Sequence, residues 1–524
     1  MKHSNRILHH PVIPIVILIA FVCIAFGNSL LNGFVSDDRW LFQTLPSDIG
    51  TIFKLNPVIH LINILWWLVY QIFQFTPWPY RLLNILAHIT GTVFFYLIVK
   101  RLIDKRVAFL SALLFAVHPI LVESVAWIAG GVYAWYGCLF ILSFYAYIRA
   151  SDAIETLRKN RSIVWFGLSY LFFVITILFS EKAIPLFLIY VVYEISRKRL
   201  KRHLKYLIPF VFIAGGFMMY YLTLLSGRMT GVAQTVGRTV EFYNPLIQIP
   251  SAFSMYFQLF IWPDRLSFYQ SETIFGLVSF IIRVIVTVSF IVAWIVSFFR
   301  SKSRMFLWFS WFVIPLLPTL TPFQIAWIVA ERYAYLSIMG LTVLTALLFD
   351  YFLSKRAWKN IIFILFIAVM IALTARTIIR TMDWRSEDTL WIATAKTAPS
   401  NQFTWNNMGD YYSRHGDLVN AASSFRRAIA IAPGYAPAYY NLAGTLLQMG
   451  ETGDAILLFK HALKIKPDFW EVHRELASLY FGKGLYEEAI NELTLGRALH
   501  ANDPVMNQNY EMLIQIRSQR NKTP

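Results

Sequence analysis

Long runs of apolar residues recur through the first three quarters of the chain and constrain its fold more than any other feature. A helix needs about 20 residues to cross the hydrocarbon core of a bilayer. About eleven runs meet this need, at residues 11–31, 80–99, 107–127, 131–149, 162–180, 183–196, 206–226, 274–299, 305–325, 330–353 and 360–379. Together with a content of 57% hydrophobic residues, they predict an all-α, polytopic membrane domain.

Basic residues cluster in the short loops between these runs and predict the orientation of the chain. The clusters lie at Lys2 and Arg6, 100–106, 149–161, 197–205, 300–304 and 355–359. All of them face the cytoplasm if two ambiguous runs, 56–75 and 251–262, lie in the membrane interface without crossing. The N-terminus is then cytoplasmic and the C-terminus external. The net charge of +18 therefore indicates topology and not a nucleic-acid partner.

Two cysteines, Cys23 and Cys138, both lie inside apolar runs. They predict neither a disulfide framework nor a cysteine metal site. They also do not indicate whether the protein lies in an oxidising or a reducing compartment. The first apolar run has no small-residue cleavage site, so we expect a retained span and not a removed signal peptide.

An acidic pair, Asp37-Asp38, follows the first span at once and is flanked by Phe34 and Trp40, which suit the headgroup level. A carboxylate held there can act as a general base on a substrate carried by a lipid phosphate. The alternative is a solvated acidic turn that ends the helix. No metal site is predicted, although one of the two carboxylates could bind a divalent cation.

The predicted topology gathers charged residues on the external face. They are Asp37, Asp38, Arg39, Arg81, Glu123, Glu181, Lys182, Arg228, Arg238, Asp264, Arg265, Glu331 and Arg332. Cations at a membrane boundary can clamp phosphate, and a guanidinium can do so with two hydrogen bonds. Taken singly, each is better explained as a snorkelling anchor at the interface, and it is their gathering that indicates a site.

Three further groups of polar residues lie within or beside the spans. Asn84 and His88 share one helix face, which predicts a polar contact between helices or, alternatively, a ligand role. His118 precedes a proline that can bend the third span, with Glu123 lining a cavity. Arg283 lies about ten positions into a span and is a further site candidate.

The chain after residue 380 changes to a repeated helical pattern with a period of 34 residues. The period relates Gly416, Gly450 and Gly484, then Ala421, Ala455 and Ala489, and also the pairs Phe425/Phe459 and Pro433/Pro467. This is the tetratricopeptide period. We therefore expect a membrane domain at 1–380 and an external repeat domain at 381–524, with repeats near 402–435, 436–469 and 470–503, the last a capping unit.

Several motifs, spread over nearly the whole chain, carry a resemblance to a known family. They are Phe34-Val35-Ser36-Asp37-Asp38, Asn84 with His88, His118-Pro119 with 123–130, Ser180-Glu181-Lys182, Trp262-Pro263-Asp264-Arg265-Leu266-Ser267 and Glu331-Arg332-Tyr333 with 334–337. In this combination the chain resembles the transmembrane and tetratricopeptide-repeat O-mannosyltransferases and their bacterial relatives, within the GT-C class. It departs from them at Leu55-Asn56-Pro57-Val58, which lacks the family's arginine, and at Arg81, where a histidine is common.

The resemblance implies a helical GT-C domain that moves a sugar, a mannose-like hexose, from a polyprenyl phosphate to a serine or threonine hydroxyl. Asp37 or Asp38 takes the proton of the acceptor as the anomeric carbon is inverted, with Asp37 preferred. Arg332, Arg265, Lys182 and Arg81 bind the donor phosphate, while Glu123, His118, Glu181, Glu331, Asn84 and His88 line the site. The repeats then present a protein or peptide acceptor.

The residues alone do not exclude two other functions, and a third is disfavoured. The same scaffold could act on a lipid or glycan acceptor, or it could be a non-enzymatic anchor whose repeats assemble an envelope complex. A transporter is disfavoured because no inverted repeat is evident. The expected location is a bacterial cytoplasmic membrane, or the endoplasmic reticulum membrane in a eukaryote.

Overall fold

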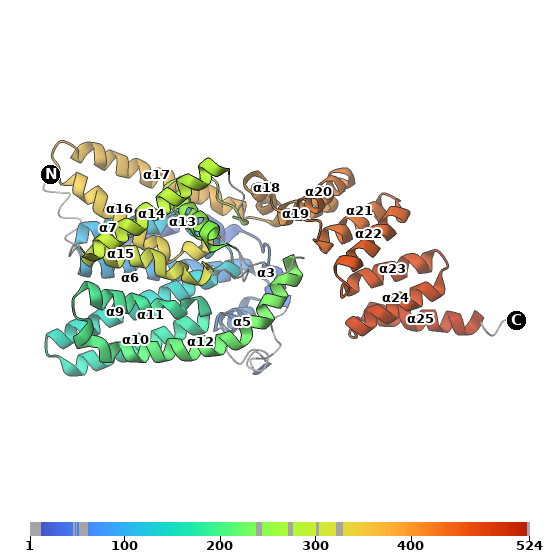
Figure 1. Cartoon of the computed structure of the whole chain (residues 1–524), viewed down its shortest axis with the longest axis horizontal. Helices are drawn as coiled ribbons and strands as arrows, with labels where there is room; N and C mark the ends of the chain where they lie inside the picture. Colours follow the sequence, from blue (N-terminus) through green and yellow to red (C-terminus); the bar gives the residue numbers. More distant parts are fainter. Residues whose placement is uncertain are drawn as a thin grey trace. The chain divides into compact units, whose positions relative to one another are not determined.

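The computed structural model describes residues 12–43, 45, 48, 50–51, 61–236, 244–270, 276–299, 303–320 and 329–520. Every regular element in these ranges is a helix (Figure 1). The chain forms two compact units, one of Met1–Gly227 with Phe242–Ala393 and one of Arg228–Glu241 with Thr394–Pro524. The first unit thus continues past residue 380, because Trp384 packs on Trp127 and Trp391 packs on Phe268.

Seven helical segments in the described ranges are long and apolar enough to cross a membrane. Six of them contain α2 (Ile13–Phe26), α6 (Pro77–Leu102), α9 (Val132–Glu155), α10 (Lys159–Phe179), α14 (Leu277–Phe299) and α17 (Lys359–Asp383). The seventh, Leu200–Leu224, is the first part of α12 (Leu200–Val236). An eighth is possible if α7 (Lys105–Val117) and the segment Pro119–Val125 form one span bent by 53°. The chain is thus a multi-pass membrane protein, but the predicted eleven spans are not confirmed.

The other predicted spans are interrupted or short. The run at 183–196 is divided between η4 (Glu181–Leu186), which contains Pro185, and the ten-residue α11 (Phe187–Ser196). The run at 305–325 contains α15 (Ser303–Val313) and η5 (Ile314–Thr319), where two prolines break the helix, and its end lies outside the described residues. α16 (Ser337–Leu353) has 17 residues, whereas the shortest of the seven segments, Ile13–Leu31, has 19.

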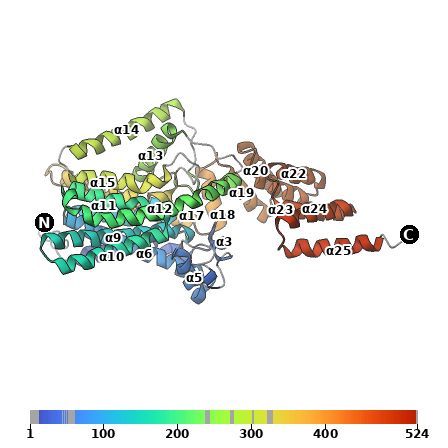
Figure 2. The ribbon, with the colours of Figure 1, turned by 60° about the horizontal axis from the view of Figure 1, so that its bottom comes forward.

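The bundle is held by close contacts between neighbouring helices. α9 packs along α10, as Figures 1 and 2 show from two directions, and α6 packs on both α7 and α9 (Figure 1). α16 approaches α15 through Gly340, where an added Cβ would lie 2.4 Å from the carbonyl oxygen of Trp308. The ambiguous runs form α5 (Leu61–Phe73) and α13 (Pro245–Ile261), both shorter than 18 residues.

The basic loops meet at one end of this bundle. Arg101 at the end of α6 pairs with Asp152, and Arg106 at the start of α7 pairs with Asp350 at 3.0 Å. Arg199 pairs with Glu155, which joins the loop after α11 to the end of α9. The clusters at Lys2/Arg6 and 300–302 lie outside the described residues. The described clusters therefore share one end, as the charge pattern predicts.

The second unit contains three antiparallel helix pairs and a final helix. The pairs are α19 (Gln402–Arg414) with α20 (Leu418–Ile431), α21 (Ala436–Gln448) with α22 (Thr452–Ile465), and α23 (Trp470–Gly482) with α24 (Tyr486–Leu499). Gly416, Gly450 and Gly484 turn each pair at φ of +77°, +87° and +75°. α25 (Pro504–Arg520) covers the last pair through Met506 and Leu513. The 34-residue period is therefore the period of the helix pairs.

Candidate functional site

The acidic pair lies in a short loop between η1 (Gly27–Leu31) and α3 (Asp38–Gln43). Its two carboxylates have different environments because Ser36 turns the chain at φ +52°. The fully buried Asp38 accepts hydrogen bonds from the backbone N–H of Val35 at 3.2 Å and from that of Ala129 at 2.9 Å. Burial raises the pKa of Asp38 to about 7, against the opposing effect of Arg81. Asp38 therefore ties the first loop to the segment after α8 (Val122–Val125).

Asp37 is exposed and its side chain contacts only the Ser36 hydroxyl, at 3.5 Å, among the described side chains. Desolvation raises the pKa of its carboxyl, while the positive charge of nearby Arg332 and the Ser36 hydroxyl oppose that rise. Of the two aspartates, Asp37 is therefore the one that can receive a proton from a bound molecule.

Arg81 is fully buried, and backbone carbonyls accept its hydrogen bonds. Its Nε donates to Ala126 O at 2.8 Å, and its two terminal nitrogens donate to Asn32 O and Gly33 O. Nη2 also lies 3.9 Å from the Asp38 carboxylate. The guanidinium thus joins α6 to the end of η1, and its role in phosphate binding stays a prediction.

Arg332 joins two distant segments through Glu123. The fully buried Glu123 carboxylate accepts one hydrogen bond from the Arg332 backbone N–H at 2.9 Å and another from its guanidinium. The rings of Trp127, Phe268 and Tyr333 surround that guanidinium, with centroids 5.1 to 5.9 Å away. Such rings stabilise a cation in a site with little water.

Lys182 lies on the same tyrosines as Arg332. Its ammonium is 5.1 Å from the Tyr133 ring centroid and 5.6 Å from that of Tyr333. None of the described carboxylates forms an ion pair with it. Two cations from separate elements, η4 and η6 (Glu331–Ala334), thus meet across one pair of tyrosines. We call Asp37, Lys182, Arg332, Tyr133 and Tyr333 the loop cluster.

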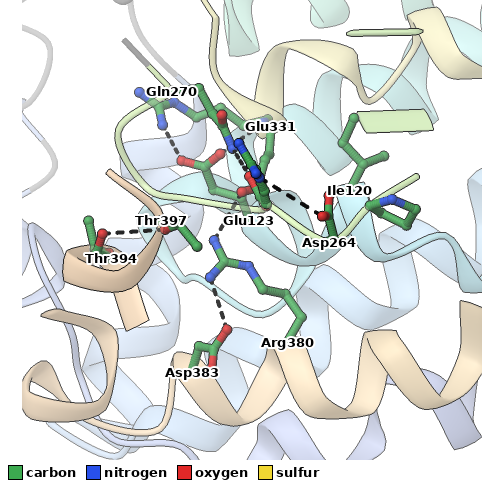
Figure 3. Close-up of polar contacts among 12 residues, drawn as sticks. Ile120, Glu123, Asp264, Gln270, Glu331, Arg380, Asp383, Thr394 and Thr397 are labelled. Atoms are coloured by element: carbon green, nitrogen blue, oxygen red, sulfur yellow. Dashed lines mark hydrogen bonds and ion pairs between the residues drawn. The ribbon is translucent and has the colours of Figure 1, made fainter. Parts of the chain in front are cut away.

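Glu331 belongs to a second, buried ion-pair chain. Arg380 donates to Glu331 at 3.0 Å and to Asp383 at 3.0 Å, as Figure 3 shows. The other Glu331 oxygen, Oε2, is buried without a hydrogen-bond partner among the described residues. Burial raises the pKa of Glu331 to about 7, and Glu123 adds to the rise while Arg380 opposes it.

The predicted polar residues of the spans contact other helices. His88 contacts the Tyr335 hydroxyl at 3.0 Å and Ala116 O at 3.2 Å, while His118 contacts Phe260 O at 2.9 Å. Asn84 donates to Trp127 O at 3.3 Å, and Arg283 donates to the Ser254 hydroxyl at 3.0 Å. All these contacts are internal, so they position the helices around the loop cluster.

Arg265 is not brought into the loop cluster. Its side chain is 75% exposed and contacts only the adjacent Asp264 among the described carboxylates, at 4.0 Å. Glu181 is half-buried next to Lys182. Arg39 is exposed, and the side chains of Arg228 and Arg238 lie outside the described residues.

Sequence reasoning missed the two arginines at the end of α17. Arg380 pairs with Glu331. Arg376 donates to Pro263 O at 3.0 Å and to Asp264 O at 3.2 Å, and these hydrogen bonds anchor the loop after α13. The sequence did indicate these two arginines, because charged residues four apart at the end of an apolar run face protein or a wet cavity.

In the described ranges, no group of three or more His, Cys, Asp and Glu side chains is arranged to hold a metal ion.

The fold and this site define a class: a multi-pass helical membrane domain with a polar cluster at one end, followed by tetratricopeptide-like helix pairs. A family model described as dolichyl-phosphate-mannose-protein mannosyltransferase matches residues 59–225. A tetratricopeptide repeat model matches 413–456 and 446–508. The predicted helical membrane domain with trailing repeats therefore agrees with both matches.

Two curated proteins are similar to this chain over 60% or more of its length. The chain is 24% identical to Protein O-mannosyl-transferase TMTC3 of Mus musculus over 543 residues, which covers 89% of this chain and 58% of that protein. It is 26% identical to Protein O-mannosyl-transferase TMTC4 of Homo sapiens, over 60% of this chain and 48% of that protein. These matches agree with the family resemblance that the sequence motifs carry. The chain spans about half the length of these relatives.

One solved structure also aligns over most of the chain. It is ArnT from Cupriavidus metallidurans bound to undecaprenyl phosphate, with a TM-score of 0.43 and 13% sequence identity. The alignment covers 90% of this chain and 81% of that one.

Proposed function

We propose that this protein transfers a sugar, a mannose-like hexose, from a polyprenyl-phosphate carrier to a serine or threonine hydroxyl of a protein acceptor. The observation that carries the proposal is the loop cluster, in which one exposed carboxylate, Asp37, lies near the cation Arg332 at the end of the membrane helices. The names of the matched family and relatives support this chemistry.

In the proposed reaction, the carrier delivers its phosphate at the membrane boundary. Lys182 and Arg332 offset the negative charge that grows on the departing phosphate, which is a dominant source of rate enhancement in such sites. Asp37 takes the proton of the acceptor hydroxyl while its oxygen attacks the anomeric carbon from the face opposite the phosphate. One bond forms and one breaks at that carbon, so the configuration inverts.

Asp38 and Arg81 act as positioning residues in this proposal. Their buried contacts fix the loop that carries Asp37, and Glu123 fixes Arg332 by two hydrogen bonds. Groups held in this way need little reorganisation when the reaction occurs. A divalent cation is not required by the proposed step.

The proposed orientation places the loop cluster on the external side, because the basic loops occupy the other end of the bundle. We place the protein in a bacterial cytoplasmic membrane, with the N-terminus in the cytoplasm. The tetratricopeptide-like pairs then serve as the binding surface for the protein acceptor, the usual use of such repeats.

The test is a transfer assay with the purified full-length chain in detergent. Polyprenyl-phosphate mannose and serine- or threonine-containing peptides are incubated with the protein, and mass spectrometry reads hexose addition. The expected result is peptide-linked hexose that is lost with Asp37→Asn and retained with the surface control Arg161→Gln. Transfer to lipid or glycan with none to peptide would overturn the protein acceptor, and equal activity of Asp37→Asn would overturn the carboxylate mechanism.

A further inference from the structure

A cavity of about 350 Å³ opens at the basic end of the membrane domain, away from the loop cluster. Its lining includes the cationic residues Arg197, Lys198 and Arg199, the Glu155 that pairs with Arg199, and the apolar residues Leu102, Leu307 and Trp308. The distance between the cavity and the loop cluster can be judged along α6. This helix carries Arg81 near its start, where Arg81 lies beside Asp38, the neighbour of Asp37, and it carries Leu102 at its end. These positions are 21 residues apart, or about 30 Å along a helix at 1.5 Å per residue.

The cavity lies where three long apolar helices end. Leu102 ends the segment Pro77–Leu102 and Glu155 ends Ala129–Glu155, while Leu200, which follows the lining residue Arg199, begins Leu200–Leu224. The end of a membrane span lies at the level of the lipid headgroups, where an apolar side and a wet side meet. A cavity that is half apolar and half cationic at this depth fits an amphiphile with a negative head.

The cationic side is built by the turn that ends α11. The N–H of Lys198 bonds Ile195 O at 2.9 Å and that of Arg199 bonds Glu194 O at 2.9 Å, the pattern of a Schellman motif. Lys198 occupies the left-handed position at φ +56°, where glycine is the usual residue. The turn therefore keeps a cation at a position that most sequences give to glycine.

The three cations of this turn are not equivalent. Arg199 is committed to Glu155, to the buried Glu194 at 3.4 Å and to the Tyr193 hydroxyl at 3.2 Å. Arg197 and Lys198 are exposed, and no described carboxylate pairs with either. Two charges thus stay available at the mouth of the cavity, while the third holds the turn in place.

From these observations we infer that the cavity binds the phosphate headgroup of an anionic phospholipid, with Arg197 and Lys198 on the phosphate and the acyl chain beside Leu102 and Leu307. This site is separate from the proposed sugar-transfer chemistry and does not depend on it. A free phosphate compound could contact the same cations, but it has no acyl chain to contact Leu102 and Leu307. A phospholipid can contact both the cationic and the apolar lining residues.

The test is native mass spectrometry of the full-length protein in neutral detergent, which counts individually bound lipids. Dioleoyl phosphatidylglycerol and dioleoyl phosphatidylcholine are titrated as probes with identical acyl chains. The site variant is Arg197→Gln/Lys198→Gln. The matched control is Lys159→Gln/Arg161→Gln, which removes the same charge from exposed residues at the same end of the bundle, outside the cavity lining.

The expected result is a first phosphatidylglycerol that binds on the order of tenfold more tightly than phosphatidylcholine, because each nearby cation favours an anionic lipid. The site variant loses this preference and the control retains it. Equal loss in both variants would show general surface charge and overturn the site. Displacement of the bound phosphatidylglycerol by millimolar inorganic phosphate would assign the cavity to a free phosphate compound and overturn the lipid.

Discussion

The Asp38 carboxylate accepts a hydrogen bond from the Ala129 backbone N–H at 2.9 Å, while its neighbour Asp37 leaves the protein surface toward solvent. Adjacent acidic residues thus have different environments: one is a buried tie between segments 91 positions apart, and the other is the exposed carboxylate that we propose as the base. This division of roles can be tested by substituting each residue in turn.

Asp37→Asn is expected to lower kcat by roughly 10²- to 10⁴-fold, the usual contribution of a general base, with no change in thermal stability. Asp38→Asn is expected to lower the free energy of unfolding by about 1–3 kcal/mol, because the buried contacts with Val35, Ala129 and Arg81 are disturbed. Transfer kinetics and thermal unfolding of both variants check this. Stability loss in Asp37→Asn with none in Asp38→Asn would reverse the assignment.

The pH dependence of transfer is expected to report the Asp37 carboxyl. A general base works when deprotonated, so activity rises with pH through its pKa, which desolvation places above the ordinary value. Arg332 opposes that rise, so Arg332→Gln is expected to move the acidic limb of the kcat/KM profile to higher pH. A limb that stays in place, or moves to lower pH, would contradict the proximity of these two groups.

Lys182 and Arg265 were both predicted to bind donor phosphate, and the structure separates them. Lys182→Gln is expected to lower kcat/KM by at least tenfold, because its ammonium lies with Arg332 on Tyr133 and Tyr333. Arg265→Gln is expected to change it less than threefold, because that side chain is 75% exposed beside Asp264. Steady-state kinetics on both variants distinguish the roles, and the opposite order would assign the phosphate to Arg265.

Gly131 allows the close approach of Asn84. A Cβ at Gly131 would lie 2.1 Å from the Asn84 side-chain oxygen, so Gly131→Ala is expected to destabilise the membrane domain by about 1–3 kcal/mol. The double variant Gly131→Ala/Asn84→Ala removes the clash and is expected to recover part of the loss. Thermal unfolding in detergent measures both, and no recovery would place the strain elsewhere.

The turn glycines of the repeats offer a matched pair. Gly450 has φ +87°, so Gly450→Ala is expected to destabilise its helix pair by about 1 kcal/mol. Gly444 lies inside α21 with open space at its Cβ position, so Gly444→Ala is expected to be neutral or stabilising. Hydrogen exchange of residues 436–465 in the full-length chain measures both, and equal effects would contradict the role of the turn.

Much of the architecture could be predicted from local sequence alone. The apolar runs give the long helices, the 34-residue period gives the helix pairs, and the positions of Lys100–Arg106 and 149–161 give the charged end of the bundle. The predicted number of spans is not confirmed in the described residues, where seven or eight helical segments are long and apolar enough to cross a membrane. Hydropathy does not register where prolines such as Pro185 and Pro315 shorten a helix within an apolar run.

The sequence by itself determined the helical membrane domain, the repeats and the residue types of the candidate site, because periodicity, length and composition act over short stretches of chain. Only the tertiary structure decided which charges are free. Arg81 donates its hydrogen bonds to backbone carbonyls, and Glu123 pairs with Arg332. Asp37, in contrast, is exposed, and Lys182 lies over two tyrosine rings. The physical reason is that a charge is neutralised by partners brought close in space, from segments that hydropathy and spacing do not connect.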